Sequence, residues 1–372
     1  MIEKQICTRC IMDTEGDPAI KFESDGTCNY CNYALERINK VYFPNEIGKK
    51  KLEDTLVKIK EYGKDKEFDC IMGISGGLDS AYLAFLGSKK WGLRILGVHV
   101  DDGFDSPIAK ENIIALCKNC EIKLITEHIN REQFMDLTRS FLFAGVPGIC
   151  IPQDNVLTAV LFEIAEKYKI KYFLSGTNFA LESILQRGNL HNACDTVHIE
   201  DIHKKFGTKP INDLPLLSLY DRYFKYKYIK GQKYIRPLDW IEYNKDKAIE
   251  ELKSVDFNYY EGKHYESILT RFLQVYYLPQ KFNIDIRKSH LSSLIISGQI
   301  SREQALNEMQ KPMFDEDKIQ EDIDFILSNL NLSRTEFNKI MAEKPKYHSD
   351  YQCSNFIKYT NIALKFRKYL SD

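Results

Sequence analysis

The stretch Ser75-Gly76-Gly77-Leu78-Asp79-Ser80 decides the fold of this chain. It follows a short apolar run at residues 70–74 and precedes residues 79–90, whose pattern predicts a helix. The two glycines lack the Cβ atoms that would keep the backbone from closing around phosphate oxygens. Two serine hydroxyls and the free N–H groups of the helix start can donate hydrogen bonds to an anion. The stretch therefore predicts a phosphate-binding loop between a strand and a helix.

The same loop lacks the lysine of the G-x-x-x-x-G-K-S/T pattern, so it does not predict an ordinary phosphoryl-transfer site. Asp79 stands where a carboxylate can hold Mg²⁺ against bound phosphates. A tight turn without a ligand is the alternative, but two glycines, two serines and an aspartate in one short loop exceed what a turn requires. We expect ATP as the ligand, in contact with Ser75, Gly76, Gly77, Asp79 and Ser80.

Strands and helices alternate on both sides of this loop. Strands are predicted at residues 70–74, 93–100, 122–128 and 171–175, and helices at 79–90, 108–118 and 155–168. The alternation predicts an α/β fold built on a parallel sheet of at least four strands. Ligands of such sheets bind beyond the carboxyl ends of the strands. Residues 75–80, 99–102 and 176–178 all fall there, so we expect them to line one pocket.

Two of these strand ends supply further nucleotide-binding candidates. We expect the backbone of Val98 and Val100 to hydrogen-bond adenine and Asp101 to share a metal ion with Asp79. A capped turn is the alternative for the acidic pair that ends this strand. The loop after the last strand is expected to approach the α phosphate or the ribose, with turn chemistry again as the alternative. Its residues are Gly176, Thr177 and Asn178.

Four cysteines near the N-terminus form two Cys-x-x-Cys knuckles. Their spacing is the one that wraps two thiolate pairs around one tetrahedral zinc ion. The sequence between the knuckles is polar and rich in turn residues, so metal binding has to supply much of its folding energy. We expect a structural zinc site, with redox-active thiols and an iron–sulfur cluster as alternatives. The ligands are Cys7, Cys10, Cys28 and Cys31.

Three other cysteines have separate interpretations. Cys117 and Cys120 follow an amphipathic helical pattern and are expected to pack in the core as small apolar side chains. Cys150 lies in a rigid loop between Pro147 and Pro152. It is expected either to be an activated thiol or only to line the site.

The composition sets limits on class and partners. With 372 residues, of which 44% are apolar, the chain can fill a large core. Its 52 basic and 53 acidic residues give a formal net charge of -1, which does not favour nucleic acid as a partner. No apolar run approaches the roughly 20 residues of a membrane span, and no signal peptide is evident, so we expect a cytoplasmic protein. Aromatic and basic residues alternate at 220–236, which suits a sugar diphosphate or RNA, although such runs are more often half-buried structure.

The loop at 75–80 resembles the SGGxDS signature of the PP-loop, or N-type, ATP pyrophosphatases, a superfamily that includes asparagine synthetase, GMP synthetase and the tRNA thiolases. The wider order of motifs is similar to that of the bacterial N-acetyl sugar amidotransferases, over residues 1 to about 312. Besides the knuckles and the loop, the matching motifs are DTVHI at 195–199, KFG at 205–207, EGKHYES at 261–267 and KSHLSS at 288–293.

The resemblance implies an AMP-forming reaction in O-antigen or nonulosonic-acid biosynthesis. In that family an acetamido group on a sugar becomes an acetamidino group. Because an amide oxygen is a poor leaving group, ATP first adenylates it, pyrophosphate departs, and ammonia then displaces AMP. Ammonia is expected from partner subunits that resemble the glutaminase and the cyclase of histidine biosynthesis, since this sequence shows no catalytic cysteine of a glutaminase.

A lysine is expected to meet the negative charge that develops on the departing pyrophosphate. The candidates are Lys263, Lys281 and Lys288. Lys263 is favoured because it lies in a short polar cluster ahead of a helix predicted at 267–277, with Lys288 as a second catalytic residue. A solvated helix start is the alternative for this cluster. The sugar is expected to contact Cys150, His264 and Glu266.

Three regions are expected along the chain. They are a zinc-binding segment with the four knuckle cysteines at 1–45, the PP-loop core at 46–265 with an insertion near 185–240, and a helical region at 266–372 that covers the sugar side. In the last region Ser301 marks a capped helix start, and residues 321–332 have an amphipathic helical pattern. Two other functions remain open. A tRNA thiolase would need catalytic thiols and a basic footprint, and a nucleotide-sensing scaffold would have no activity.

Overall fold

A computed structural model describes residues 4–356 except 261 and 263. A five-stranded sheet of order β3-β2-β1-β4-β5 lies at its centre, and all four neighbouring pairs are parallel. The strands are β1 (Cys70–Gly73), β2 (Ile95–Asp101), β3 (Lys123–His128), β4 (Tyr172–Leu174) and β5 (Lys233–Ile235). The expected α/β class is confirmed. The fifth strand comes from the aromatic and basic stretch, which forms a helix followed by an edge strand.

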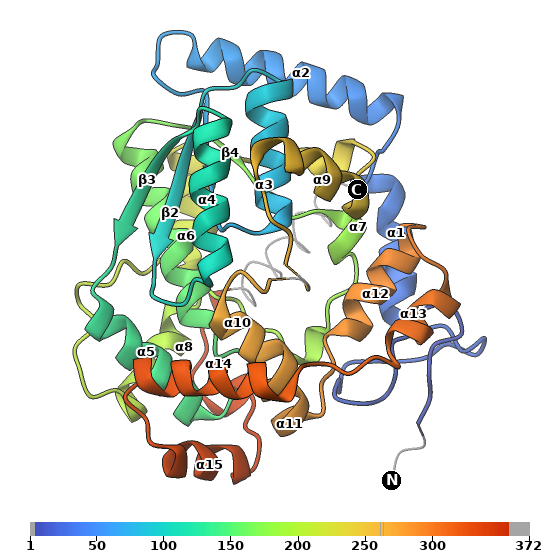
Figure 1. The fold of residues 1–372 in the computed structure, drawn as a ribbon, viewed down its shortest axis with the longest axis vertical. Helices are drawn as coiled ribbons and strands as arrows, with labels where there is room; N and C mark the ends of the chain where they lie inside the picture. Colours follow the sequence, from blue (N-terminus) through green and yellow to red (C-terminus); the bar gives the residue numbers. More distant parts are fainter. Residues whose placement is uncertain (1–3, 261, 263, 357–372) are drawn as a thin grey trace, which may run out of the picture.

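Alternating side chains of the strands build two apolar layers, one on each face of the sheet. Ile71 packs into one layer, while its neighbours Cys70 and Met72 pack into the other. The layer around Cys70 contains residues of α2 (Glu46–Gly63), α3 (Leu78–Phe85), α4 (Pro107–Asn119) and α9 (Lys245–Leu252). The layer around Ile71 contains residues of α5 (Arg131–Ala144), α6 (Ile151–Lys167), α8 (Thr196–Phe206), α10 (Ile268–Phe272), α14 (Glu316–Asn329) and α15 (Arg334–Ala342). Figure 1 shows α4 in front of the strands and α6 behind them.

Two helices begin earlier than their apolar patterns predict. The helix expected from residue 155 starts at Ile151, because Pro152 occupies the first turn, where no backbone N–H is needed. The helix expected at 321–332 is α14, which begins at Glu316 and ends at Asn329. Its start is fixed by Asp315, whose side chain accepts hydrogen bonds from two backbone N–H groups of the first turn. The capped start at Ser301 is confirmed, with a complete capping box.

Three segments continue as wide π-helical turns. The predicted helix at 79–90 is α3 followed by η1 (Leu86–Lys90), and the predicted helix at 267–277 is α10 followed by η6 (Leu273–Tyr277). The third is η3 (Asp221–Ile229), which precedes β5. Four short 3-10 helices connect other elements. They are η2 (Arg187–Asn189), η4 (Pro237–Trp240), η5 (Lys253–Val255) and η7 (His348–Asp350).

The N-terminal knuckles pack beside the sheet against helices from distant parts of the chain. Their cysteines share an apolar cluster with Phe179, Ile184 and Ile296. The surrounding helices are α1 (Asn29–Val41), α7 (Phe179–Glu182), α12 (Arg287–Ile296) and α13 (Arg302–Glu308), of which α1, α12 and α13 lie together in Figure 1. The short helix α11 (Leu278–Phe282) follows η6. Cys117 and Cys120 are buried in the core as expected. Among the described residues no helix combines the length and the apolar character needed to cross a bilayer.

Candidate active site

The loop after β1 closes on itself through its two serines. Ile74 N–H donates to the carbonyl of Val98 on β2 (2.8 Å), after which the chain leaves the sheet. The Ser75 and Ser80 hydroxyl oxygens lie 3.0 Å apart, and Gly77 N–H donates to Ser75 Oγ (3.1 Å). The helix α3 begins directly after Gly77, so its free N–H groups face the loop. The strand, loop and helix therefore have the arrangement that the sequence predicted for a phosphate site.

Both glycines of the loop are required by close approach. Gly76 has a φ of 77°, and a Cβ atom there would lie 2.6 Å from the carbonyl oxygen of Ala109 at the start of α4. A Cβ atom on Gly77 would lie 2.6 Å from Oε1 of Glu266. The loop thus touches a second helix on one side and a carboxylate on the other. The carboxylate comes from a segment nearly two hundred residues along the chain.

Asp79 lies in the first turn of α3 and is oriented by a buried tyrosine. The hydroxyl of Tyr243 donates a hydrogen bond to Asp79 Oδ1, and the tyrosine is 1% exposed. Burial, followed by the charge of Asp79, raises the pKa of Tyr243 well above its ordinary value. The phenol therefore stays protonated and fixes the carboxylate. Tyr243 was not predicted from the sequence, because no local pattern could have shown a contact over this separation.

Glu266 is fixed in the same way by Tyr260, whose hydroxyl donates to Oε2 (2.8 Å). Its other oxygen, Oε1, lies 3.6 Å from Nδ1 of His264. Burial on its own would raise the pKa of Glu266, but the hydrogen bond and charge of His264 outweigh burial and leave the pKa below its usual value. The carboxylate is therefore ionised. The sequence analysis assigned Glu266 and His264 to the sugar, and the structure places Glu266 against the PP-loop.

A short pairing between two loops holds Glu266 in position. Ser106 N–H donates to the carbonyl of Glu266 (2.8 Å), and Ile268 N–H donates to the carbonyl of Phe104 (2.8 Å). His99 joins this pairing to the PP-loop, because its ring nitrogens lie 3.1 Å from the carbonyl oxygen of Ile74 and 3.1 Å from Asp105 Oδ2. The end of β2, the PP-loop and the segment before α10 are therefore one connected unit.

The end of β2 carries the two residues expected to contact adenine. The carbonyl of Val98 accepts a hydrogen bond from Ile74 N–H (2.8 Å). Val100 lies two residues farther, beyond the last pair of the β1–β2 register at Gly73 and Val98. The adenine contacts expected of Val98 and Val100 stay predictions.

The two aspartates that follow differ in environment. Asp101 accepts a hydrogen bond from Gly103 N–H (3.3 Å), and its carboxylate is partly exposed. Asp102 is buried and accepts hydrogen bonds from Gln153 Nε2 (2.5 Å) and Phe104 N–H (2.9 Å). Burial raises the pKa of Asp102 to about 6. Asp102 therefore has the role of capping a turn, which was the alternative for this acidic pair. Asp101 stays a predicted ligand of the metal ion that Asp79 is expected to bind.

The loop after β4 reaches the PP-loop through its glycine. A Cβ atom on Gly176 would lie 3.1 Å from Ser80 N, which shows how closely this loop packs on the start of α3. Thr177 is exposed, whereas Asn178 is fully buried and caps α7 by accepting from Leu181 N–H (2.9 Å). An asparagine ahead of a helix is a known capping signal, so its structural role was readable from the sequence. Gly176 and Thr177 remain the candidates for nucleotide contact.

Of the three predicted lysines, the structure describes two, and the contacts of both lie away from the loop. Lys263 lies outside the described residues. Lys288 donates to Asp13 Oδ1 (2.8 Å) and Glu15 Oε2 (3.0 Å), so its described contacts are with the knuckle region. Lys281 donates to two backbone carbonyls at the end of α15. A catalytic role for Lys263 or Lys288 stays a prediction.

Cys150 lies in the core beside the site. It is 7% exposed, and its Sγ is 3.9 Å from the hydroxyl of Thr270. Burial raises its pKa far above the ordinary value of a thiol. An activated thiolate is therefore not favoured at Cys150, and the side chain packs behind the site.

The four knuckle cysteines form a closed cluster that could hold a metal ion. All four are 0% exposed, and their sulfur atoms lie within 4.8 Å of one another. Arg9 donates to Cys31 Sγ (3.4 Å), and Arg302 donates to the carbonyls of Cys10 and Cys7 (3.0 Å each). These cations partly balance the charge that four thiolates around a divalent ion would carry.

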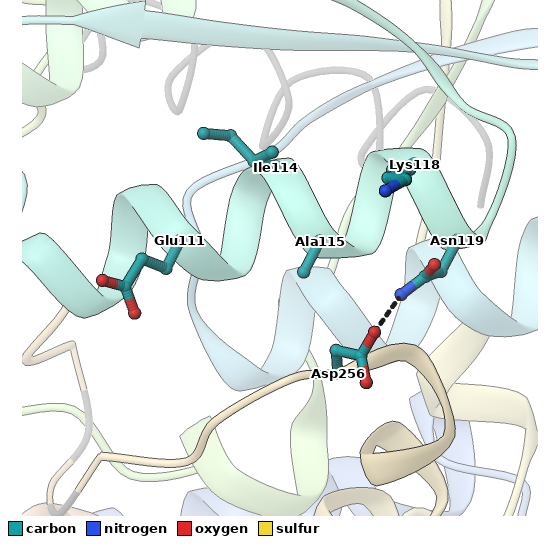
Figure 2. Close-up of a pocket in the computed structure, with 6 residues that line it drawn as sticks. All are labelled: Glu111, Ile114, Ala115, Lys118, Asn119 and Asp256. Carbon is teal, nitrogen blue, oxygen red and sulfur yellow. Dashed lines mark hydrogen bonds between the residues drawn. The ribbon is translucent and has the colours of Figure 1, made fainter.

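A separate surface pocket, of about 330 Å³, lies on the outer side of α4. Figure 2 shows its side chains along this helix, with Asn119 donating to Asp256 Oδ2 (2.9 Å). None of the predicted site residues lines this pocket, so it is not the site of the chemistry.

Comparison with known proteins places the C-terminal region in a described family. Residues 266–365 match the family "LPS biosynthesis protein WbpG-like, C-terminal domain". A curated relative, the uncharacterized protein MJ1599 of Methanocaldococcus jannaschii, is 24% identical over 307 residues, which cover 82% of this chain and 93% of that one. The tRNA-specific 2-thiouridylase MnmA 2 of Fusobacterium nucleatum is 28% identical over 120 residues, which are 30% of this chain and 34% of that protein.

Solved structures are more distant. The U34-tRNA thiolase NcsA from Methanococcus maripaludis, determined with a 4Fe-4S cluster, is 16% identical with a TM-score of 0.36, over 82% of this chain and 88% of its own. The NMN synthetase from Francisella tularensis is 15% identical with a TM-score of 0.31, over 83% of this chain and 96% of its own. Scores this low support no inference about chemistry. The site is therefore interpreted from its own residues and from the family match.

Proposed function

We propose that this chain, whose residues 266–365 are a WbpG-like C-terminal domain, is an ATP-dependent, AMP-forming amidotransferase that acts on an N-acetylated sugar in lipopolysaccharide biosynthesis. In the proposed reaction the acetamido oxygen is replaced by nitrogen to give an acetamidino sugar. The family match and the PP-loop support an ATP-utilising enzyme. The identity of the substrate rests on the family resemblance seen in the sequence.

The contact between Glu266 and the PP-loop carries this proposal. Glu266 is the first residue of the match to the WbpG-like domain, and its Oε1 lies 2.6 Å from the position that a Cβ atom of Gly77 would take. The domain of the polysaccharide family therefore begins on the phosphate loop itself. A substrate held by that domain would lie next to the phosphates of ATP, as direct adenylation of the substrate requires.

The described residues fit the binding of ATP with magnesium. Asp79 and Glu266 are carboxylates at the loop that are fixed by tyrosine hydroxyls, and hard oxygen ligands of this kind suit Mg²⁺. Magnesium would offset the charge of the pyrophosphate as it departs. The loop N–H groups would bind the β and γ phosphates, and Val100, Gly176 and Thr177 would approach the nucleoside and the α phosphate.

The reaction balances in two steps. The amide oxygen attacks the α phosphorus, the bond to the bridging oxygen breaks, and pyrophosphate leaves. Ammonia then attacks the activated carbon, AMP departs with the former amide oxygen, and the nitrogen loses a proton to give the amidine. We propose that ammonia comes from a glutaminase subunit resembling that of histidine biosynthesis, with a cyclase-like subunit as a second possible partner.

We also propose that the knuckle cysteines bind one zinc ion with a structural role. Cys7 Sγ lies 3.7 Å from Cys31 Sγ, and Cys10 Sγ lies 3.6 Å from Cys28 Sγ. A tetrahedral ion with Zn–S bonds of about 2.3 Å holds its sulfurs about 3.8 Å apart, close to these values. In an iron–sulfur cubane each cysteine binds a different iron, which spreads the sulfurs more widely. Metal analysis of purified protein tests this, since iron with acid-labile sulfide would contradict zinc.

The function is tested with purified protein, ATP, Mg²⁺, ammonium and a nucleotide-linked diacetamido sugar. We expect AMP and pyrophosphate together with a sugar in which one oxygen is replaced by an NH group, detected by mass spectrometry. An assay without the sugar is the control and should give little AMP. Formation of ADP in place of AMP would refute the proposed mechanism.

A tRNA thiolase is the second candidate, because MnmA 2 matches part of the chain. Such an enzyme would consume ATP with tRNA and a sulfur donor and leave the sugar unchanged. The burial of Cys150 and of Cys194, whose pKa burial raises to about 11, does not favour either as a sulfur-carrying thiol. Thiolated tRNA, with no reaction of the sugar, would select this alternative.

A further inference from the structure

A second group of metal-binding side chains lies where α8 meets the segment after α15. His191 precedes α8, His198 lies in its first turns, and Cys353 follows η7. Each offers one ligand atom, and the three atoms lie within 4.8 Å of one another. The knuckle cysteines form their own closed cluster, so this group is not part of that site.

The separation of the best-defined pair matches a shared metal ion. Nδ1 of His198 lies 3.7 Å from Cys353 Sγ. A tetrahedral zinc ion with bonds of about 2.0 Å to nitrogen and 2.3 Å to sulfur separates these ligand atoms by roughly 3.6 Å. Because the widest separation in the group reaches at most 4.8 Å, binding needs an inward movement of about 1 Å.

Both histidines have the outer hydrogen-bond partners that metal ligands usually have. Nε2 of His191 lies 3.0 Å from Asp195 Oδ2, which also accepts from Ser354 N–H (2.9 Å). Nε2 of His198 lies 3.0 Å from Nδ1 of His348. Nδ1 of His198 also lies 3.2 Å from the carbonyl oxygen of Gln352, so a metal ion would take the place of that contact. With each Nε2 donating its proton outward, the opposite ring nitrogen then has a lone pair for a metal. Asp195 and His348 thus orient the two candidate ligands.

The hydrogen-bonding groups of the three histidines His191, His198 and His348 are not all satisfied by the described residues. Three imidazole rings crowd together, with centroids 4.2 Å apart for His191 and His198 and 5.0 Å apart for His198 and His348. Nε2 of His348 is buried without a hydrogen-bond partner.

We propose that His191, His198 and Cys353 bind a zinc ion that ties residues 348–353 to α8. Mixed imidazole and thiolate ligands suit zinc, and three protein ligands leave the fourth position for water. The ion would attach the segment after α15 to α8, which packs in the same apolar layer as α5. This site is independent of the proposed amidotransferase reaction, since none of its ligands contacts the PP-loop among the described interactions.

The metal content of the full-length protein tests this site. The protein is equilibrated with buffered zinc at about micromolar concentration, and bound zinc is measured by mass spectrometry. We expect two zinc ions per chain in the native protein and one in His191→Asn and in Cys353→Ser. His203→Asn is the matched control, because His203 lies on α8 with His198 and, like His191, hydrogen-bonds a carboxylate, that of Asp136. The control should keep both ions.

The native protein also gives a test that needs no variant to fold. X-ray absorption at the zinc edge should show nitrogen scatterers beside sulfur, because the knuckle supplies only sulfur. A shell of sulfur alone, or no zinc ion beyond one held by the knuckle, would overturn the proposal. Retention of two ions by His191→Asn combined with Cys353→Ser would overturn it as well.

Discussion

The N-terminal knuckle and the PP-loop are both short motifs, but they are completed in different ways. All four ligands of the knuckle lie between Cys7 and Cys31, and each is fully buried. The PP-loop instead depends on distant partners, namely Ala109, Tyr243 and Glu266. A closed site of local residues suits a role in stability. An open site assembled from separate segments suits chemistry on a bound substrate.

The largest expected effect concerns the open site. Asp79→Asn keeps an acceptor for the hydroxyl of Tyr243 but removes the negative charge that would hold magnesium. We expect the rate of AMP formation to fall by about 10²–10³-fold, with the melting temperature little changed. Asp256→Asn, which alters an aspartate on the outer side of α4, is the control. Activity of Asp79→Asn within about twofold of the native enzyme would contradict its role.

Lys288 tests whether the knuckle and the catalytic site are separate. Lys288→Ala leaves Asp13, which is 3% exposed, without its cation, so we expect a loss of about 3–5 kcal/mol in the free energy of unfolding. Lys311→Ala breaks an exposed pair with Glu308 and should cost less than about 1 kcal/mol. Urea unfolding measures both. A fall in kcat with unchanged stability would instead make Lys288 catalytic, as the sequence suggested.

Asp102 links the site to pH. Its folded pKa of about 6 lies above the ordinary 3.8, so between these values the folded state binds more protons than the unfolded state. Stability should therefore fall as the pH rises through this window, by at most roughly 3 kcal/mol. In Asp102→Asn this contribution is absent. Urea unfolding across the window should give a flatter profile for the variant, and parallel profiles would show that the shift is wrong.

The smallest expected effect concerns the fit of the loop. In Gly77→Ala the new methyl group would lie 2.6 Å from Glu266 Oε1. The flexible side chain of Glu266 can move away, but its carboxylate is then displaced from the loop. We expect about a tenfold loss in kcat/KM. Gly73→Ala is the matched control, because a Cβ atom there has nothing within 4 Å. Equal activity of the two variants would show that the contact with Glu266 has no catalytic importance.

Local chemistry explains what the sequence could predict. The residues from Ser75 to Ser80 carry their strand, turn and helix signals within a few positions, and the knuckle spacing is equally local. Tyr243 and Tyr260 could not be predicted, because their importance arises only when the fold brings their hydroxyls to two carboxylates. Asn178 was assigned to the nucleotide, and in the structure its side chain caps α7. The capping pattern was readable from the sequence, but an asparagine after a strand also fits a ligand contact. The expected domain boundaries at residues 45 and 265 stay predictions.

The central claim is that ATP activates the amide oxygen of an N-acetyl sugar. The most direct measurement uses a substrate whose acetamido carbonyl carries a heavy oxygen isotope, and follows that atom by mass spectrometry. The proposed reaction transfers the label to the phosphate of AMP, because the amide oxygen attacks the α phosphorus and leaves with it. Label that remains on the sugar, or that appears in pyrophosphate or water with unlabelled AMP, would contradict the claim.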